Sequence, residues 1–331
     1  MKIAMVGCGA LGCWYGARLS RVGQQVHFLL RSDFETVRAN GLRVESPEGD
    51  FTLRPPIHEQ PQTIGVVDLV CIGLKTTAND QYAPLITPLV GPHTRLLCLQ
   101  NGLGNCERLA TLFPAEQILG GLCFVCLNRT APGVVRHIAF GKVVLGEFGR
   151  PAAARTREVA SLFEDAGVPC VVAENLERAL WEKLVWNIPF NGLGVAAAAG
   201  WSAFENGGRE IAGALETTLP SDQLLDDPRW LRAVRELMAE VIAVANAKGL
   251  RADTEQAERM IVNTRRMGSY RASSILDFER GQPMELEAMF LEPLRQARTT
   301  GVATPRLEAL CAVLESLERR RLAQPPGNSL R

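Results

Sequence analysis

Residues 2–12 read KIAMVGCGALG, an apolar run that leads into a glycine-rich turn. Residues 3–7 are predicted to form a strand, and residues 10–22 to form a helix. Between a strand and a helix, the pattern G-x-G-x-x-G permits a tight turn and lets the backbone approach a pyrophosphate group. This context is the one the motif requires, so we predict a dinucleotide-binding loop. Its members are Gly7, Cys8, Gly9, Ala10, Leu11 and Gly12.

Strand-like and helix-like segments alternate through the first half of the chain. Apolar runs are predicted as strands at 25–30, 66–74, 95–101 and 168–173, with helical segments that include 151–168. Residues 133–146 look like a hairpin or antiparallel strands near the sheet edge. Continuously apolar strands alternating with helices are typical of a parallel, doubly wound sheet. We therefore predict an α/β, Rossmann-type domain over residues 1–173.

Strand signals end near residue 174, and long helical patterns follow. Helices are expected at 174–200, 229–248, 253–267, 284–300 and 303–321. This pattern predicts an all-α C-terminal domain over residues 174–322. Residues 201–228 are expected to be rich in loops, and residues 323–331 to form a disordered tail.

Composition and charge exclude several function classes for this chain of 331 residues. Lys+Arg and Asp+Glu both total 36, so no excess of positive charge favours nucleic acid or an anionic membrane surface as a partner. No apolar run is long enough to span a bilayer, and residues 1–12 lack a basic leader and a cleavage site. We expect a small-molecule partner and no signal peptide, and the sequence allows a homodimer.

Cysteine and histidine usage points to a reducing compartment and to no metal site. The nine cysteines are scattered and odd in number, which favours reduced thiols and a cytoplasmic location. Cys123 and Cys126 form the one close pair, and we interpret them as core residues because they lie in the apolar run 118–128. Only four histidines are present, and they are dispersed, which is not typical of a zinc site.

The end of the second predicted strand indicates which nucleotide is bound. Residues 29–33 read LLRSD, so Arg31 and Ser32 stand where an NAD site usually has an acid for the ribose diol. A guanidinium can pair with a 2′-phosphate, and a hydroxyl can add a hydrogen bond. Asp33, two residues after Arg31, is the NAD-type alternative. We predict NADP(H) as the cofactor, with Arg31 as its 2′-phosphate ligand.

A second pattern lies far from the glycine loop, in the apolar stretch ALWEKLVWNIPFNGLGV. Lys183, Asn187 and Asn191 recur at steps of four residues, so they share one side of the predicted helix. Polar groups on a largely buried helix need partners, because an unpaired buried group costs about 1–3 kcal/mol. Together with the nucleotide loop, this stripe suggests the reduction of a small carbonyl compound.

These motifs resemble the ketopantoate reductases (2-dehydropantoate 2-reductases) over nearly the whole chain. The resemblance rests on GCGALG (7–12), Arg31, LKT (74–76), QNGLG (100–104), WEKLVWNIPFN (181–191) and SSILDFERGQPMEL (273–286). It implies an N-terminal Rossmann domain followed by a helical domain. It also implies that Lys183 is the catalytic acid and that Asn187, Asn191 and Ser274 hold the substrate. Asn101 would serve both cofactor and substrate, and Glu285 would contact the cofactor.

The residues themselves leave alternatives open at several of these positions. Asn101 and Lys75 each follow a predicted strand end, where ligands bind in open α/β sheets, and Lys75 could meet a phosphate or the substrate. Ser274 could instead cap a helix, and Ser273 could take its place at the substrate. Glu285 is expected at the start of a helix, where a carboxylate suits the helix dipole.

Three features depart from the family pattern. Pro189 sits between the two asparagines and should bend the helix, because proline lacks a backbone donor. Gly192 follows Asn191 where the family commonly has proline, and the spacing from Ser274 to Glu285 is one residue short. The region 201–228 is also longer than expected.

The function predicted from these residues is reduction of a 2-keto acid by NADPH. Ketopantoate is the first candidate substrate, with pantoate as the product, as in pantothenate biosynthesis. One alternative is a D-2-hydroxy acid dehydrogenase of the same scaffold that acts on another keto acid. A second alternative is an NADP-sensing protein without catalytic activity.

Overall fold

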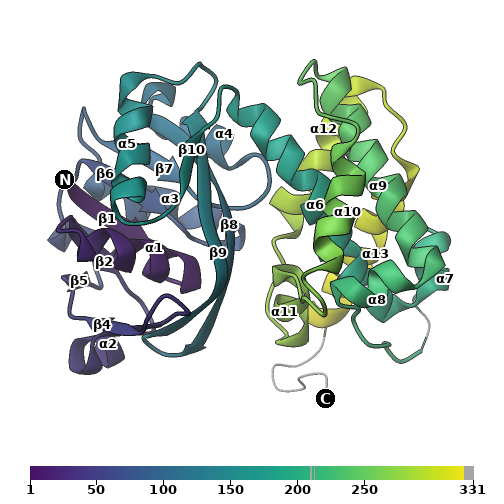
Figure 1. Ribbon diagram of the computed structural model, residues 1–331, viewed down its shortest axis with the longest axis horizontal. Helices are drawn as coiled ribbons and strands as arrows, with labels where there is room; N and C mark the ends of the chain where they lie inside the picture. Colours follow the sequence, from purple (N-terminus) through teal and green to yellow (C-terminus); the bar gives the residue numbers. More distant parts are fainter. Residues whose placement is uncertain (209–210, 212, 324–331) are drawn as a thin grey trace. The chain divides into compact units, whose positions relative to one another are not determined.

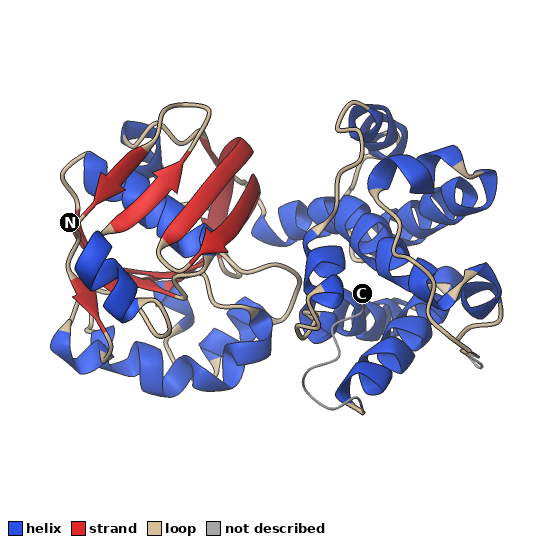
Figure 2. Cartoon of the chain, turned by 90° about the horizontal axis from the view of Figure 1, so that it is seen from below, coloured by secondary structure: helices blue, strands red, loops and turns tan. Residues whose placement is uncertain are grey.

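The computed structural model describes residues 1–208, 211 and 213–323. The chain divides into two compact units, Met1–Ala179 and Leu180–Arg331, and the division falls inside helix α6 (Leu176–Ala196) (Figure 1). The first unit contains every strand of the described residues, and the second is built from helices (Figure 2). The predicted tail lies outside the described residues, apart from Ala323.

Six parallel strands form the Rossmann part of the first unit. In order across the sheet they are β5 (Ile57–His58), β2 (Gln25–Leu29), β1 (Lys2–Val6), β6 (Leu69–Ile72), β7 (Arg95–Cys98) and β8 (Ile118–Ala131). Counted along the chain, this is the order 3-2-1-4-5-6 of dinucleotide-binding folds. Strands β1 and β6 are almost wholly buried, as expected for parallel strands with both faces covered. The predicted α/β fold class is confirmed.

The sheet continues past β8 with a long antiparallel hairpin. Strand β9 (Val134–Glu147) pairs antiparallel with β8, and the turn contains Gly133 at φ +70°. Strands β3 (Leu42–Glu45) and β10 (Cys170–Val172) add to β9, and β4 (Phe51–Leu53) adds to β3. The sheet is therefore mixed, with antiparallel pairs beyond its parallel part.

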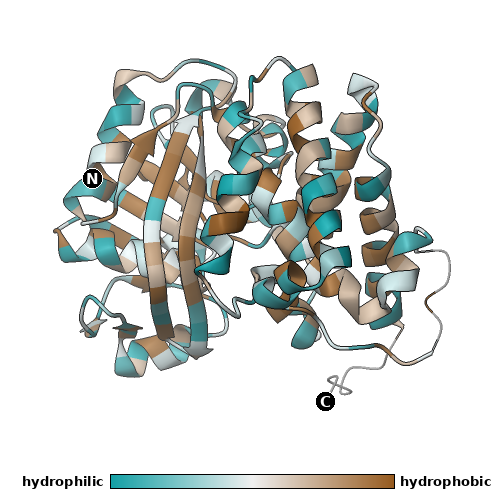
Figure 3. Cartoon of the chain, turned by 45° about the vertical axis from the view of Figure 1, so that its right-hand side comes forward, coloured by the Kyte–Doolittle hydropathy of each residue, from teal (hydrophilic) through white to brown (hydrophobic). Residues whose placement is uncertain are grey.

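This hairpin differs in detail from the prediction for residues 133–146. Those residues form one continuous strand, and its partner is the preceding apolar run that contains Cys123 and Cys126. Both cysteines are buried, and no disulfide joins any of the nine cysteines, all of which the structure describes. Figure 3 shows long apolar stretches along these strands. The apolar character of the run around Cys123 thus reflects a buried strand.

Helices cover both faces of the sheet in the first unit. They are α1 (Ala10–Arg21), α2 (Phe34–Asn40), α3 (Tyr82–Ile86), α4 (Asn105–Ala110) and α5 (Ala154–Asp165). Helix α1 begins directly after the glycine loop, and its Trp14 and Tyr15 are buried in the core with Phe28 of β2 and Phe163 of α5. This packing fixes the helix N-terminus at the carboxyl end of β1, where the predicted cofactor loop lies.

The second unit has no strand among its described residues. Its helices are the rest of α6, α7 (Trp201–Glu205), α8 (Ser221–Asp226), α9 (Pro228–Ala247), α10 (Gln256–Arg265), α11 (Ser273–Glu279), the π-helix η6 (Glu287–Leu291), α12 (Glu292–Thr300) and α13 (Pro305–Leu322). The stretch 201–228 thus contains two short helices, with residues 209, 210 and 212 outside the description. No helix of the described residues is long and apolar enough to cross a membrane.

Helix α6 remains one helix through Pro189 and is buried over most of its length. Glycines in the second half of α6 allow neighbouring segments to approach its backbone closely. A Cβ on Gly192 would come within 2.5 Å of Leu310 Cδ2, and one on Gly194 within 2.8 Å of the Leu219 carbonyl oxygen. A Cβ at Gly192, one of the departures from the family pattern, would therefore require the Leu310 side chain of α13 to move.

Candidate active site

The glycine loop has the geometry that a bound pyrophosphate requires. Gly7 has φ +94°, and a Cβ there would lie 2.2 Å from the backbone nitrogen of Leu74. A Cβ on Gly12 would lie 2.4 Å from the Gly7 carbonyl oxygen, so both positions need glycine for close packing. Gly9 differs, because a Cβ there meets no atom within 4 Å. Its open side leaves room for a phosphate group at the start of α1, so the residues present fit a dinucleotide.

The end of β2 separates the two candidate ribose ligands. Arg31 and Ser32 are exposed, and Arg31 makes no ion pair with the residues that the structure describes. Asp33 is buried and fully engaged. Its carboxylate accepts hydrogen bonds from Ser32 Oγ (2.9 Å), from the Gly133 amide (2.9 Å) and from the Arg129 guanidinium. The acid of the NAD-type alternative is thus held by the protein itself.

Two further predicted residues follow strand ends in the same unit. Lys75 is exposed three residues after β6, at the start of a 3₁₀ turn. Asn101 is half-buried three residues after β7, and Gly102 and Gly104 next to it both have φ +82°. Strands β6 and β7 are parallel neighbours in the sheet, so their carboxyl ends lie side by side. The structure therefore places Asn101 and Lys75 at the carboxyl edge of adjacent strands, as predicted for ligand-binding residues.

A polar network that sequence reasoning did not identify supports the Asn101 loop. The Tyr82 hydroxyl donates to Gln100 Oε1, and Gln100 Nε2 donates to Asn79 Oδ1 (2.8 Å). Asn79 Nδ2 then donates to Asn105 Oδ1 (2.9 Å), and Asn105 Nδ2 donates to the Asn101 carbonyl oxygen (2.9 Å). Buried networks of this kind make a loop rigid when each member is satisfied. The available signal was the clustering of amides after β6 and β7.

In the second unit, the stripe on α6 reaches α11. Asn191 is buried, and its Oδ1 accepts hydrogen bonds from Ser273 Oγ (3.1 Å) and from the Ser274 amide (3.0 Å). These contacts use the amide oxygen and leave the Nδ2 end as the donor for a ligand. The Ser273 hydroxyl is committed to Asn191, whereas the Ser274 hydroxyl makes no hydrogen bond to the described residues. The structure thus brings Asn191, Ser273 and Ser274 together.

The other two members of the stripe differ in burial. Lys183 is half-buried, whereas Asn187 is only 7% exposed and its amide makes no hydrogen bond to the described residues. Between them lies Trp186, whose Nε1 donates to Thr264 Oγ1 (2.9 Å) and whose ring stacks on Phe190. A nearly buried amide without a protein partner is expensive unless a ligand supplies one.

Glu285 lies directly before the helical turn at Leu286 and is buried. The next five residues form the π-helix η6, which widens the backbone by one residue per turn. Such bulges are frequent at functional sites. Glu285 is in the same unit as Lys183, and its backbone carbonyl oxygen accepts a hydrogen bond from the Met289 backbone amide (3.1 Å).

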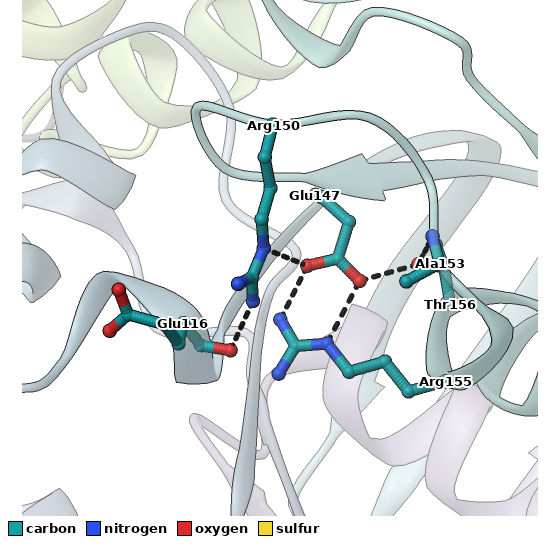
Figure 4. Close-up of polar contacts among 6 residues, drawn as sticks. All are labelled: Glu116, Glu147, Arg150, Ala153, Arg155 and Thr156. Atoms are coloured by element: carbon teal, nitrogen blue, oxygen red, sulfur yellow. Dashed lines mark hydrogen bonds and ion pairs between the residues drawn. The ribbon is translucent and has the colours of Figure 1, made fainter.

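Within the described residues no group of three or more His, Cys, Asp or Glu side chains is placed to hold a metal ion. The buried ion-pair cluster around Glu147 has a structural role. Glu147, at the end of β9, accepts from Arg150 Nε (3.0 Å), Arg155 Nε (2.9 Å) and Thr156 Oγ1 (2.5 Å) (Figure 4). Burial acts to raise the pKa of Glu147, but these hydrogen bonds outweigh it and the pKa is lowered. The cluster joins β9 to the start of α5.

Two family models match this chain in sequence. The model described as ketopantoate reductase PanE/ApbA matches residues 3–150, and the model of its C-terminal domain matches residues 213–318. A 2-dehydropantoate 2-reductase from Nostoc sp. is 36% identical over 326 residues, which cover 96% of each chain. The chain belongs to the ketopantoate reductase family.

Solved structures of this family share the fold. The 2-dehydropantoate 2-reductase of Geobacter metallireducens is 45% identical, with a TM-score of 0.86 over 96% of this chain and 99% of that one. The enzyme of that name from Methylococcus capsulatus is 32% identical, with a TM-score of 0.86 over 99% and 100%. D-mandelate dehydrogenase in complex with NADH and anilino(oxo)acetate is 20% identical, with a TM-score of 0.84 over 98% and 100%, and shares the fold alone.

Proposed function

We propose that this ketopantoate reductase family member reduces a 2-keto acid to a 2-hydroxy acid with NADPH. Ketopantoate is the proposed substrate and pantoate the product, as in pantothenate biosynthesis in the cytoplasm. The observation that carries the proposal is the polar stripe of α6, where Lys183, Asn187 and Asn191 recur at steps of four residues in a largely buried helix. A family member that only sensed the nucleotide would need the glycine loop but not this face.

The proposed role of Lys183 is that of general acid. When bound, the cofactor supplies the hydride for the carbonyl carbon. The Lys183 ammonium donates a hydrogen bond to the carbonyl oxygen and stabilises the negative charge that develops there. It then transfers a proton to that oxygen, which completes the hydroxyl group. A half-buried position suits this task, because electrostatic interactions strengthen where water is partly excluded.

The proposed anchors of the substrate carboxylate are the Asn191 amide and the Ser274 hydroxyl. Both are buried, and the protein contacts of Asn191 occupy its oxygen only. The Ser273 hydroxyl donates a hydrogen bond to Asn191 Oδ1 and so positions the side-chain amide of Asn191. Neutral donors bind a carboxylate without placing a second fixed positive charge beside Lys183. We assign Asn187 to the substrate side of the helix as well, as a group that orients Lys183 and the bound keto acid.

The proposed cofactor residues are the glycine loop, Lys75, Asn101, Glu285 and Arg31. Arg31 is assigned to the 2′-phosphate, which implies a preference for NADPH over NADH. The contacts of Asp33 support this preference, because its carboxylate already accepts hydrogen bonds from Arg129 and Gly133. Arg31→Ala should narrow the preference about 10- to 150-fold, the range of a charge-assisted hydrogen bond. Binding constants for both nucleotides measure this directly. Equal binding of NADPH and NADH by the unmodified protein would contradict the assignment.

A shared fold and one packing position favour a second candidate substrate class. The fold is shared with D-mandelate dehydrogenase, and Gly192 replaces the proline common in ketopantoate reductases at a packing position near Asn191. Removal of that ring changes the packing behind the proposed carboxylate anchor. A D-2-hydroxy acid dehydrogenase that acts on a bulkier keto acid is therefore the alternative.

A panel of keto acids tests the proposal. Oxidation of NADPH should be followed with ketopantoate, with a branched aliphatic 2-keto acid and with benzoylformate. We expect the highest kcat/KM with ketopantoate. A higher value with benzoylformate would favour the dehydrogenase. Tight NADPH binding without turnover of any keto acid would favour a nucleotide sensor.

A further inference from the structure

An ion pair at the end of β2 was not part of the predicted cofactor site. The carboxylate of Asp33 and the guanidinium of Arg129 are in direct contact, although 96 residues separate them in the chain. Asp33 follows β2, and Arg129 lies near the end of β8. The Asp33 side chain is 8% exposed and that of Arg129 is 39% exposed. The acid is thus covered, while the cation still reaches the surface.

The pair has contacts on two sides. Arg129 Nη2 lies 3.5 Å from Ser32 Oγ, and the Ser32 hydroxyl donates to Asp33 Oδ1 (2.9 Å). On the other side, the Gly133 amide at the β8–β9 turn donates to Asp33 Oδ2 (2.9 Å). The hairpin turn and the loop after β2 are therefore joined through Asp33. Arg129 is held beside Ser32, one residue from Arg31.

The cluster borders the glycine loop. The pKa of the Cys8 thiol in that loop is raised, first by its contact with Cys13 and by burial, and also by the negative charge of Asp33. Strands β1 and β2 are neighbours, with Val6 paired to Leu29, so the glycine loop and Asp33 follow adjacent strand ends. This is the region in which a dinucleotide fold places the adenosine ribose, and charges there discriminate between the 2′-hydroxyl and the 2′-phosphate.

We infer that Arg129 is a second residue that determines cofactor specificity, in addition to Arg31. It opposes the charge of Asp33, which would otherwise repel a 2′-phosphate and could serve a ribose diol. It also presents a partly exposed guanidinium beside Ser32 to the phosphate itself. This inference rests on the proposed use of NADPH, which it deepens by assigning a residue from β8 to the recognition of the 2′-phosphate.

The test is the binding of NADPH and of NADH, each without substrate, by calorimetry. Arg129→Met should weaken NADPH binding about 5- to 30-fold, between the values typical of an exposed ion pair and of a charge-assisted hydrogen bond. Binding of NADH should change less than about threefold by the same reasoning, because NADH has no 2′-phosphate. Adenosine 2′,5′-bisphosphate and AMP should show the same contrast. Arg129→Lys, which keeps the positive charge, should retain most of the preference.

Three further variants separate the effect of charge from an effect on folding. In Asp33→Asn/Arg129→Met the repulsion is absent, so NADPH binding should recover part of the loss. Arg136→Met removes an ion pair between β9 of the same hairpin and Glu45 of β3, and it should leave the affinity for both nucleotides unchanged. Asp33→Asn alone should not weaken NADH binding. Thermal unfolding of each variant confirms that the protein is folded.

Several results would overturn the inference. These are an equal loss of NADPH and NADH binding in Arg129→Met, no loss of either, no recovery in the double variant, or weaker NADH binding in Asp33→Asn. The last result would show that Asp33 binds the ribose. If the unmodified protein prefers NADPH and Arg31→Ala reduces that preference while Arg129→Met does not, the inference fails and the proposed cofactor stands.

Discussion

The proposed site in one unit of this protein is formed mainly by backbone, and that in the other unit by side chains. In the Rossmann unit the site is mainly backbone: Gly7 and Gly12 are glycines because nothing larger fits, and Gly9 leaves space open. Polar side chains nearby are largely engaged with each other, as Asp33 is with Arg129. In the helical unit the site consists mainly of side chains on the buried helix α6, with Ser274 of α11, and the side-chain amide of Asn187 makes no hydrogen bond to the described residues.

This difference predicts which kinds of substitution each site should tolerate. A backbone site is damaged by adding atoms, because added atoms occupy the space that the ligand needs. A side-chain site is damaged by removing atoms, because the ligand then loses a hydrogen-bond partner. The first kind of change should act on nucleotide binding, and the second on turnover and on the keto acid.

The largest effect is expected at Lys183. Lys183→Ala should lower kcat by about 10²–10⁴-fold, the usual contribution of general acid catalysis, with NADPH affinity nearly intact. Steady-state kinetics and nucleotide titration together measure both quantities. Lys248→Ala is a matched control, since that lysine donates to Gln296 in the same unit. Near-normal turnover in Lys183→Ala would remove the acid role from this residue.

A smaller loss is expected from the carboxylate anchor. Asn191→Ala should lower kcat/KM about 5- to 150-fold, at about 1–3 kcal/mol for the lost hydrogen bonds, chiefly through KM. Asn187→Ala should act chiefly on kcat if its amide orients Lys183. Ser273→Ala, which loses only the contact that positions Asn191, should have an intermediate effect. Unchanged kcat/KM in Asn191→Ala would mean that the stripe serves helix packing.

In the glycine loop the test is to add atoms, and two glycines of the same motif should respond differently. A methyl group on Gly9 meets no protein atom, so Gly9→Ala should leave stability unchanged but weaken NADPH binding by roughly tenfold, or about 1.4 kcal/mol. Gly12→Ala should lower the melting temperature, because its Cβ would overlap the Gly7 carbonyl oxygen. Thermal unfolding and titration of both variants are needed. Equal nucleotide binding in Gly9→Ala and the unmodified protein would contradict the backbone account.

The smallest effect on catalysis is expected at Glu147. Its lowered pKa means that the folded state binds the proton more weakly than the unfolded state, so its stabilisation is present above the unfolded pKa of about 4.3 and is lost as pH falls through the folded pKa. Glu147→Gln should cost about 1–3 kcal/mol at pH 7, with kcat nearly unchanged. The difference in unfolding free energy between the two proteins should shrink below pH 4. A constant difference down to pH 3 would refute this role.

Local patterns were sufficient for the parts of the fold that depend on near neighbours. The loop at 7–12 and helix α1 follow from glycine spacing and from apolar periodicity. The partner of β9 could not be assigned in this way, because pairing with β8 is decided by contacts that span the hairpin. The same holds for Asp33, whose engagement by Arg129 depends on a residue 96 positions away.

The candidate site divides along the same line. Spacing along one helix was enough to place Lys183, Asn187 and Asn191 on a common stripe. The sequence favoured Ser274 at the substrate with Ser273 as the alternative, and their hydroxyl groups are distinguished by the hydrogen bond from Ser273 Oγ to Asn191. The network from Tyr82 to Asn101 was missed because its members alternate between two chain segments, 79–82 and 100–105, and no periodicity links them.

The most direct measurement follows the hydrogen that is transferred. The protein should be supplied with ketopantoate and with NADPH deuterated at the transferable position of the nicotinamide, and the product analysed by mass spectrometry. The account predicts pantoate that carries one deuterium on the carbon of the new hydroxyl group, with far less product from Lys183→Ala in the same time. Product without deuterium, or no product from protein that binds NADPH, would contradict it.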